Sequence, residues 1–356
     1  MKPKEIANRP YVFALENKDS EEALFAEKVL KKIGFASIEN VCFLDSQMDF
    51  DCLKAVVDGQ PRYFKYSFDA DAPFFAREFD ILKQLAPFAP VPHKHGKIKY
   101  GDSMQYLLTS LEDVETVAEF GISSILEHKD SFLFSFDKFR GVSVDRNFSH
   151  HINDIFDRCD IEKLPEHSIE SIKSHSDINQ LRSIVAILKN EILYLSRSSF
   201  CKNSEFCHGN LNTNNILIKN NLFKFQHLQS GYMGNQMFDL CHLFINMGLP
   251  LEYQRQFAQD YKSLFPDFNQ NEFIEEYNYC YNLMLRLFVY EAIFDYLCEI
   301  YLYENSRPAK ILQTVSVFLR NEAALATIPS LSQYTSFLVR DIMEPLIGSS
   351  KNSADS

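Results

Sequence analysis

The most informative stretch of this 356-residue chain runs from Phe206 to Ile218 and reads FCHGNLNTNNILI. Before it, apolar residues recur at three- and four-residue steps and predict a helix over 177–198. A His-Gly pair and a run of asparagines end that pattern, because glycine and asparagine favour turns. After it, residues 215–218 and 222–226 have the composition of two short strands of a hairpin. The stretch is therefore predicted to be a loop that joins a helix to a hairpin.

The residues upstream of this loop predict a mixed α+β lobe with an antiparallel sheet. Amphipathic helices and short strands follow one another in the order helix, three strands, helix, two strands. The dipeptide Asp58-Gly59 is typical of a hairpin turn, and Gly34 is typical of a helix end. The predicted helices are 20–33 and 74–85, and the predicted strands are 38–46, 52–59, 61–68, 95–100 and 103–111.

The residues downstream predict a larger and mostly helical part. Helical patterns return from residue 238 and continue to about residue 343, whereas residues 113–175 show only weak periodicity. No low-complexity linker separates the two parts of the chain. We therefore predict an N-terminal lobe at 1–112 and a helical C-terminal lobe at 113–356, joined by a short hinge.

The loop 206–218 resembles the catalytic loop of the aminoglycoside phosphotransferase and choline kinase families, which reads His-Gly-Asp-Leu-His-x-x-Asn-Ile-Leu. These families share a bilobal, protein-kinase-like α+β fold, which the resemblance implies for this chain. It also implies that His208 and Asn210 stand at catalytic positions, with Asn210 in place of the catalytic Asp, and that Asn215 stands at a metal-binding Asn. Farther along, FQHLQSGY at 225–232 resembles the families' Ile-Asp-Trp/Phe-Glu-x-x-Gly-Tyr, which puts Gln226 at the metal-binding Asp.

The resemblance extends into the N-terminal lobe. Lys65 lies near the end of the third predicted strand, where these families have a lysine that contacts phosphate. Glu78 lies on the next predicted helix, where the ion-pair partner of that lysine belongs. The resemblance covers roughly residues 40 to 300 in the families' order. It implies ATP and Mg²⁺ as cofactors, with Lys65 and Glu78 at the nucleotide and Asn215 and Gln226 at the metal.

Two departures from the family pattern affect the catalytic and metal positions. Asn210 supplies a neutral amide where a carboxylate would accept a proton, and general acid–base catalysis contributes about 10²–10⁴-fold in rate. Gln226 removes a carboxylate that Mg²⁺ prefers as a ligand. If the alignment is shifted by one residue, His227 takes that position, and it suits magnesium no better.

A third departure concerns the segment expected over the nucleotide phosphates. Kinase-like folds often place glycine there so that backbone amides approach the phosphates. The chain has only 11 glycines, and none lies between Gly34 and Gly59. Asp45, Asp49 and Asp51 lie in this interval instead, and their charge is expected to repel a nucleotide triphosphate.

These departures together favour a pseudokinase, in which the fold is kept, phosphoryl transfer is lost or strongly reduced, and the chain acts as a binding or regulatory module. The alternative is an active ATP-dependent kinase of a small hydroxylated or amino compound, such as an aminoglycoside or a choline-like substrate. It would take its metal carboxylate from Asp45, Asp49, Asp51 or Asp239. Nucleotidyl transfer is a third hypothesis, which rests on the fold alone. The asparagines of the loop are also open to a simpler interpretation as turn residues, and Asp239 to one as a carboxylate that braces the loop.

The composition limits the kinds of partner that the protein is expected to bind and the cellular compartment in which it is expected. The net charge is −12, which disfavours binding to a nucleic-acid backbone, and no apolar run predicts a membrane span. The expected ligand is therefore a small molecule or a protein. Eight cysteines without a CxxC pair, and the lack of a secretory signal, predict a cytoplasmic protein with reduced thiols. Cys201, Cys207 and His208 have no spacing typical of zinc sites, and buried thiols are the favoured interpretation.

Overall fold

The computed structural model describes residues 21–46, 51–68, 74–100, 102–111, 115–120, 123–160, 178–202, 204–302 and 328–332. Internal contacts group the chain into two compact units. The first unit comprises residues 1–144 and 214–231, and the second comprises residues 145–213 and 232–356. This grouping of contacts does not by itself locate a boundary between lobes, so the division at residue 112 stays a prediction.

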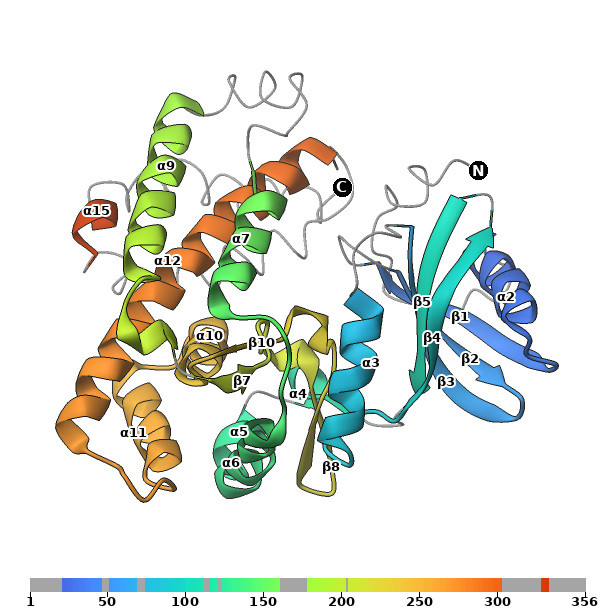
Figure 1. Ribbon diagram of the computed structural model, residues 1–356, viewed down its shortest axis with the longest axis horizontal. Helices are drawn as coiled ribbons and strands as arrows, with labels where there is room; N and C mark the ends of the chain where they lie inside the picture. The colour runs from blue at the N-terminus through green and yellow to red at the C-terminus, as the bar shows by residue number, and fades with distance from the viewer. Residues whose placement is uncertain are drawn as a thin grey trace, which may run out of the picture. The chain divides into compact units, whose positions relative to one another are not determined.

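The first unit contains a five-stranded antiparallel sheet in the order β1-β2-β3-β5-β4 (Figure 1). The predicted antiparallel sheet is thereby confirmed, including the turn at Asp58-Gly59, where both residues have positive φ. The five strands are β1 (Ile38–Ser46), β2 (Asp51–Val57), β3 (Gln60–Ser67), β4 (Pro92–Tyr100) and β5 (Asp102–Ser110).

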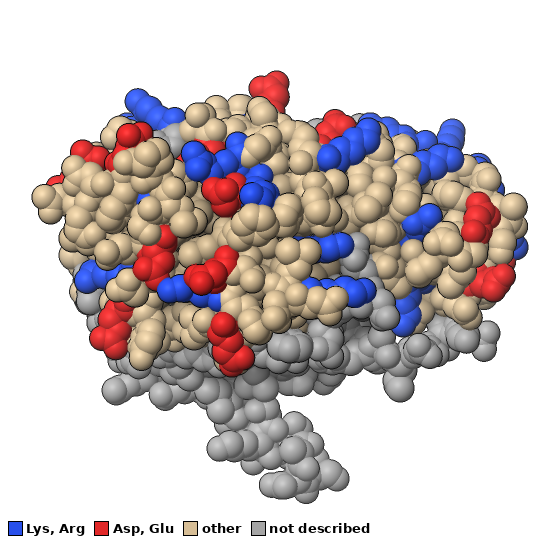
Figure 2. Space-filling model, turned by 90° about the horizontal axis from the view of Figure 1, so that it is seen from below, with Lys and Arg blue, Asp and Glu red and all other residues tan. Residues whose placement is uncertain are grey.

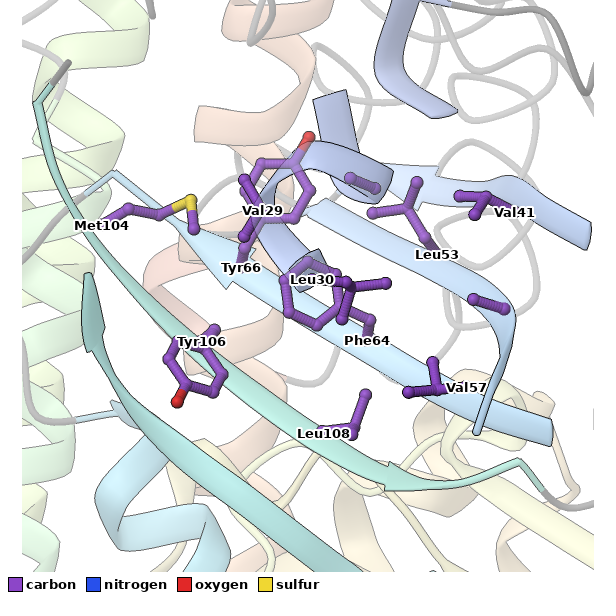
Figure 3. Close-up of a cluster of buried hydrophobic side chains, with 12 residues drawn as sticks. Val29, Leu30, Val41, Leu53, Val57, Phe64, Tyr66, Met104, Tyr106 and Leu108 are labelled. Carbon is purple, nitrogen blue, oxygen red and sulfur yellow. The ribbon is translucent and has the colours of Figure 1, made fainter. Parts of the chain in front are cut away.

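The last four residues of strand β3, 64–67, are all buried, and because successive side chains point to opposite sides of a sheet, both faces are covered there. Phe64 and Tyr66 point toward helix α2 (Glu21–Ile33) and join its apolar residues in one core (Figure 3). Lys65, which lies between them, therefore points to the opposite face. The fully or nearly buried members of the core are Ala26, Val29, Leu30, Val41, Leu53, Ala55, Val57, Phe64, Tyr66, Met104, Tyr106 and Leu108.

The face that carries Lys65 is covered by helix α3 (Phe74–Leu85), so that α2 and α3 lie on opposite sides of the sheet (Figure 1). The buried residues of α3 recur at helical spacing, which gives the helix one inward face. Glu78 is on that face, although a carboxylate is seldom buried without a partner. The buried residues are Phe75, Glu78, Ile81, Leu82 and Leu85.

Strand β4 forms one edge of the sheet and carries three exposed lysines, Lys94, Lys97 and Lys99. Lysines on an edge strand oppose pairing with the sheet of another molecule. Figure 2 shows lysine and arginine side chains gathered on the part of the surface that the five-stranded sheet occupies.

The rest of the first unit is built from short elements around a small sheet of order β6-β8-β9. Aromatic rings from α6 and β9 pack together, with Phe132 against Phe223 at a centroid distance of 5.5 Å. The elements are β6 (Glu115–Thr116), α4 (Val117–Phe120), α5 (Ser123–Glu127), α6 (Lys129–Asp137), η1 (Lys138–Gly141), β8 (Ile216–Lys219), β9 (Leu222–Phe225) and η5 (Leu228–Ser230).

The second unit is mostly helical, as expected. Its longest helix, α12, contacts both α9 and α10, while α7 contacts the short strand β10. No helix among the described residues is both long enough and apolar enough to cross a membrane. The elements are α7 (Phe148–Arg158), α9 (Ile178–Leu195), η3 (Ser199–Lys202), β7 (Glu205–Cys207), β10 (Tyr232–Gly234), α10 (Met237–Met247), α11 (Leu251–Lys262), α12 (Gln270–Leu302) and α15 (Pro329–Ser332), and η4 (Thr213–Asn215) lies where the two units join in sequence.

Candidate functional site

Lys65 and Glu78 form a buried ion pair in the first unit. The Nζ atom of Lys65 lies 2.7 Å from Oε1 of Glu78, and the two side chains are 3% and 1% exposed. The strand period turns Lys65 toward α3, and the helix period turns Glu78 toward the sheet. The structure therefore brings together the two residues that the sequence predicted to pair.

Helix α3 is also bonded to the segment that follows strand β9. Oε1 of Glu78 accepts a hydrogen bond of 3.1 Å from the backbone N–H of Leu228. One residue earlier on the helix, Arg77 donates to the carbonyl oxygen of Gln229 at 3.0 Å. Oε2 of Glu78 is buried and has no hydrogen-bond partner among the residues that the structure describes. The carboxylate thus connects the lysine of β3 with the chain after Gln226.

The hairpin of β8 and β9 places Asn215 opposite Gln226. Its turn uses Asn220 and Asn221, whose φ values of 51° and 61° are tolerated by asparagine and match a two-residue hairpin turn. Ile216 pairs with Phe225 at the other end of the hairpin. The residues just beyond that pair are Asn215 and Gln226, which therefore meet at its open end.

Gln226 is hydrogen-bonded to the backbone of Asn214 and Asn215. The backbone N–H of Gln226 donates to the carbonyl oxygen of Asn215 at 3.1 Å. Nε2 of Gln226 donates to the carbonyl oxygen of Asn214 at 3.1 Å. Asn215 is 7% exposed, so its amide is largely enclosed by protein. The predicted metal positions are thus adjacent, and both are neutral.

His227 follows with a left-handed backbone, at φ 62° and ψ 50°. Histidine adopts this region more readily than most non-glycine residues, but still at a cost. Its ring lies against Tyr63 of β3, with centroids 6.0 Å apart and an interplanar angle of 80°. The neighbouring bonds of Leu228 and Gln229 to α3 hold the segment in this conformation.

In the second unit, Asp239 at the start of α10 fixes the backbone of His208 and Gly209. Its carboxylate accepts hydrogen bonds from the backbone N–H groups of His208, at 2.5 Å, and Gly209, at 3.0 Å. Burial raises the pKa of Asp239 to about 7, although the two N–H groups lower it. Gly209 has φ 79°, a conformation that glycine adopts without strain. Asp239 therefore braces the loop, which confirms that interpretation of the sequence.

Further hydrogen bonds within the loop occupy His208 and Asn210. His208 is fully buried, and its Nδ1 accepts from the backbone N–H of Asn210 at 3.3 Å. Oδ1 of Asn210 accepts from Nδ2 of Asn212 at 2.9 Å. The side-chain oxygen at the position of a catalytic base is thus already engaged by a neighbouring amide.

The register of the sheet separates Asp51 from Lys65. Asp51 pairs with Tyr66 and is 8% exposed, whereas Cys52 pairs with Lys65. Paired residues lie on the same face, so Asp51 shares the α2 face with Tyr66 and not the face of Lys65. Of the other expected carboxylates, Asp45 lies opposite Cys52 in the register, and Asp49 is outside the described residues.

The donors at Asn215 and Gln226 do not fit a magnesium ion. Mg²⁺ binds hard anionic oxygens, usually one or two carboxylates together with substrate phosphates. Among the residues that the structure describes, no group of three or more His, Cys, Asp or Glu side chains could hold a metal.

The described elements define a two-lobed, protein-kinase-like α+β fold. Among solved structures, the chain is similar to choline kinase LicA from Streptococcus pneumoniae, with a TM-score of 0.53, 12% identity and coverage of 85% of this chain and 99% of that chain. It is also similar to the spectinomycin phosphotransferase APH(9)-Ia in complex with ADP and spectinomycin, with a TM-score of 0.52, 11% identity and coverage of 88% and 98%.

The aminoglycoside phosphotransferase APH(4)-Ia gives a TM-score of 0.51 at 14% identity, with coverage of 85% of this chain and 97% of that chain. No protein-family model and no curated protein sequence matches the chain. Identities this low establish the fold alone. The expected kinase-like fold is thereby confirmed, and the roles of its site residues stay predictions.

Sequence reasoning missed the residues that connect the predicted ones. The bonds from Arg77 and Glu78 to the backbone of Gln229 and Leu228 join segments about 150 positions apart, and a backbone donor leaves no signature in the sequence. The contact of Tyr63 with His227 was also missed. The period-two pattern of β3 could have placed Tyr63 on the face of Lys65, since the two residues are two positions apart.

Proposed function

We propose that this protein is a pseudokinase, a kinase-like binding or regulatory module for a small molecule or a protein, with phosphoryl transfer lost or strongly reduced. The observation that carries the proposal is that Asn215 and Gln226, hydrogen-bonded backbone to backbone at the open end of the hairpin, have amide side chains and no carboxylate. Magnesium ions neutralise the charge that develops on the transferred phosphoryl group in kinases. A site that holds them weakly loses that stabilisation.

The state of Asn210 supports the same proposal. An amide has no useful basicity, and its oxygen already accepts a hydrogen bond from Asn212. General-base catalysis is worth about 10²–10⁴-fold, so its loss compounds the loss of the metal carboxylate. The bonds of Asp239 to His208 and Gly209 preserve the loop itself. The scaffold of the loop is thus kept while its reactive groups are replaced.

The second candidate is an active phosphotransferase of a small hydroxylated or amino compound. The buried pair of Lys65 and Glu78 favours it, because such a pair positions phosphates in kinases. The similar structures include a spectinomycin phosphotransferase and a choline kinase, which supports small polar substrates as the class to test. Against it, Asp239 is already engaged by two backbone N–H groups, and Asp51 lies on the α2 face.

The proposal is tested by ATP turnover and by thermal unfolding with ATP, in the presence of Mg²⁺, Mn²⁺ or EDTA. We expect no metal-dependent turnover, and no rise in melting temperature that requires Mg²⁺ and ATP together, because linkage raises stability only when a ligand binds the folded state. Metal-dependent turnover that disappears in Lys65→Ala would overturn the proposal and establish the second candidate. The exposed residue Lys219 on β8 provides the matched control, Lys219→Ala.

A further inference from the structure

Tyr63 and Lys65 lie on the same face of the five-stranded sheet. They are two residues apart on β3, so their side chains point the same way, about 7 Å apart along the strand. In the register, Tyr63 pairs with Thr109 and Lys65 pairs with Leu107. The Nζ atom of Lys65 lies 6.0 Å from the centroid of the Tyr63 ring. Any group that contacts the lysine therefore lies beside this ring.

His227 meets the same ring from the segment that follows β9. The two rings pack edge to face, with centroids 6.0 Å apart, which is a favourable geometry for an aromatic pair. The left-handed backbone of His227 directs its ring there, and the bonds of Leu228 and Gln229 to α3 fix the residues that follow. The residue that follows His227 is thus hydrogen-bonded to Glu78, the ion-pair partner of Lys65.

A nucleotide held by the lysine of the third strand must place its phosphates, and the nucleoside attached to them, along the face that carries that lysine. In this chain, that face already holds the aromatic pair of Tyr63 and His227 beside the ammonium group. The Lys65 side chain is only 3% exposed. A planar base that enters next to Lys65 has to separate the two rings or displace one of them.

We infer that Tyr63 is a specificity-determining residue that, through its contact with His227, closes the Lys65 face of the sheet to nucleotides. This inference rests on the proposed function, since it explains how the pseudokinase excludes the usual ligand of its fold. It concerns binding in the absence of metal, whereas the proposed function concerns metal-dependent turnover. The two therefore fail in different experiments.

The test measures the affinity of ATP by isothermal titration calorimetry in EDTA, for the wild type, Tyr63→Ala and Tyr63→Phe. We expect Tyr63→Ala to bind ATP about tenfold more tightly than the wild type, the factor that corresponds to the loss of one aromatic pair. Tyr63→Phe keeps the ring and should bind like the wild type. Adding Lys65→Met to Tyr63→Ala should remove the gain, which assigns the binding to this face.

A second variant guards against a Tyr63→Ala chain that fails to fold. His227→Gly removes the other ring, and glycine accepts the left-handed backbone at no cost, so the segment keeps its course. It should give the same gain in ATP affinity. The inference is overturned if Tyr63→Ala and His227→Gly both bind ATP no more tightly than the wild type. It is also overturned if Tyr63→Ala still binds ATP more tightly after Lys65→Met is added. Neither result bears on metal-dependent turnover, which tests the proposed function separately.

Discussion

Glu78 accepts a hydrogen bond from the backbone N–H of Leu228, at 3.1 Å, through the same oxygen that lies 2.7 Å from the ammonium of Lys65. One buried carboxylate oxygen therefore serves a strand of the sheet and the segment after β9. Removing the carboxylate would take one charged acceptor from the buried ammonium of Lys65 and from the backbone N–H of Leu228. Both losses are costly in a protein interior.

The first prediction concerns this pair. Glu78→Ala should lower the free energy of unfolding by about 3–5 kcal/mol, because the buried ammonium of Lys65 loses the carboxylate that neutralises it at 2.7 Å. Lys65→Met should lower the free energy of unfolding by less, since methionine has nearly the length of lysine and carries no charge. The double variant, with both changes, should lose less free energy of unfolding than the two single variants lose together. Urea unfolding of the four proteins gives the interaction free energy directly.

An exposed ion pair of the same unit supplies the control for that cycle. Lys31 and Glu27 are four residues apart on α2, and their side chains are 59% and 35% exposed. Solvent screening makes such pairs worth at most about 0.5 kcal/mol. A cycle at Lys65 and Glu78 that yields no more than the cycle at Lys31 and Glu27 would contradict the prediction.

The second prediction concerns the proton of Asp239. Burial raises its pKa to about 7, whereas the pKa of an aspartate in the unfolded chain is about 3.9. Between these values the folded state keeps a proton that the unfolded state has released. The contribution of Asp239 to the free energy of unfolding therefore falls as the pH rises from about 4 to about 7, by up to about 4 kcal/mol.

Comparison with Asp239→Asn isolates that contribution, since the amide does not titrate. We expect the stability of the wild type relative to Asp239→Asn to decrease steadily between pH 4 and pH 7. Urea unfolding at intervals of half a pH unit measures the difference. A stability difference that stays constant over this range would show that the carboxyl titrates alike in both states.

The pattern of apolar residues was sufficient to predict the elements that carry the site. Helix α3 was predicted at 74–85 and runs from Phe74 to Leu85, because its inward face repeats clearly over three turns. The hairpin of β8 and β9 was predicted because asparagines mark its turn between two apolar runs. These local signals predicted the elements, whereas the pairing of Lys65 with Glu78 and of Asn215 with Gln226 was implied only by the resemblance to known families.

Other features could not be predicted because they depend on short elements or on register. Helices α4 and α5 have four and five residues, too few to show a helical period, so this part of the chain gave only a weak pattern. Asp51 was expected near the phosphate-binding face, but its pairing with Tyr66 puts it on the α2 face. A shift of one residue along a strand exchanges the two faces, and sequence patterns locate strands less finely than that.

The third prediction concerns His151 in the second unit. This buried residue stacks on Tyr232, with ring centroids 4.3 Å apart and an interplanar angle of 20°. Burial lowers its pKa well below the usual 6.5, and repulsion from Arg146, Arg158 and His242 lowers it further. The unfolded state therefore binds a proton that the folded state does not, and stability falls as the pH drops below about 6.5.

His151→Phe keeps a stacked ring and removes the proton site. We expect the stability of the wild type relative to His151→Phe to decrease as the pH falls from 7 to 5, measured by urea unfolding. The trend is opposite in sign to that of Asp239, so the wild-type curve alone would hide both. A relative stability that does not change between pH 7 and pH 5 would contradict a neutral, buried His151.

The fourth prediction concerns Gln226→Asp, which restores a carboxylate beside Asn215 at the open end of the hairpin. One carboxylate and one amide oxygen, completed by water and phosphate, approach the ligands that Mg²⁺ prefers. Millimolar Mg²⁺ with ATP should raise the melting temperature of Gln226→Asp by about 2–4 °C and leave that of the wild type unchanged, since a ligand that binds the folded state stabilises it. Gln226→Asn is the matched control, because it has the size of Asp without the charge. If the melting temperatures of Gln226→Asn and Gln226→Asp rise equally, the metal binds elsewhere. The lack of a carboxylate at residue 226 would then not explain weak magnesium binding.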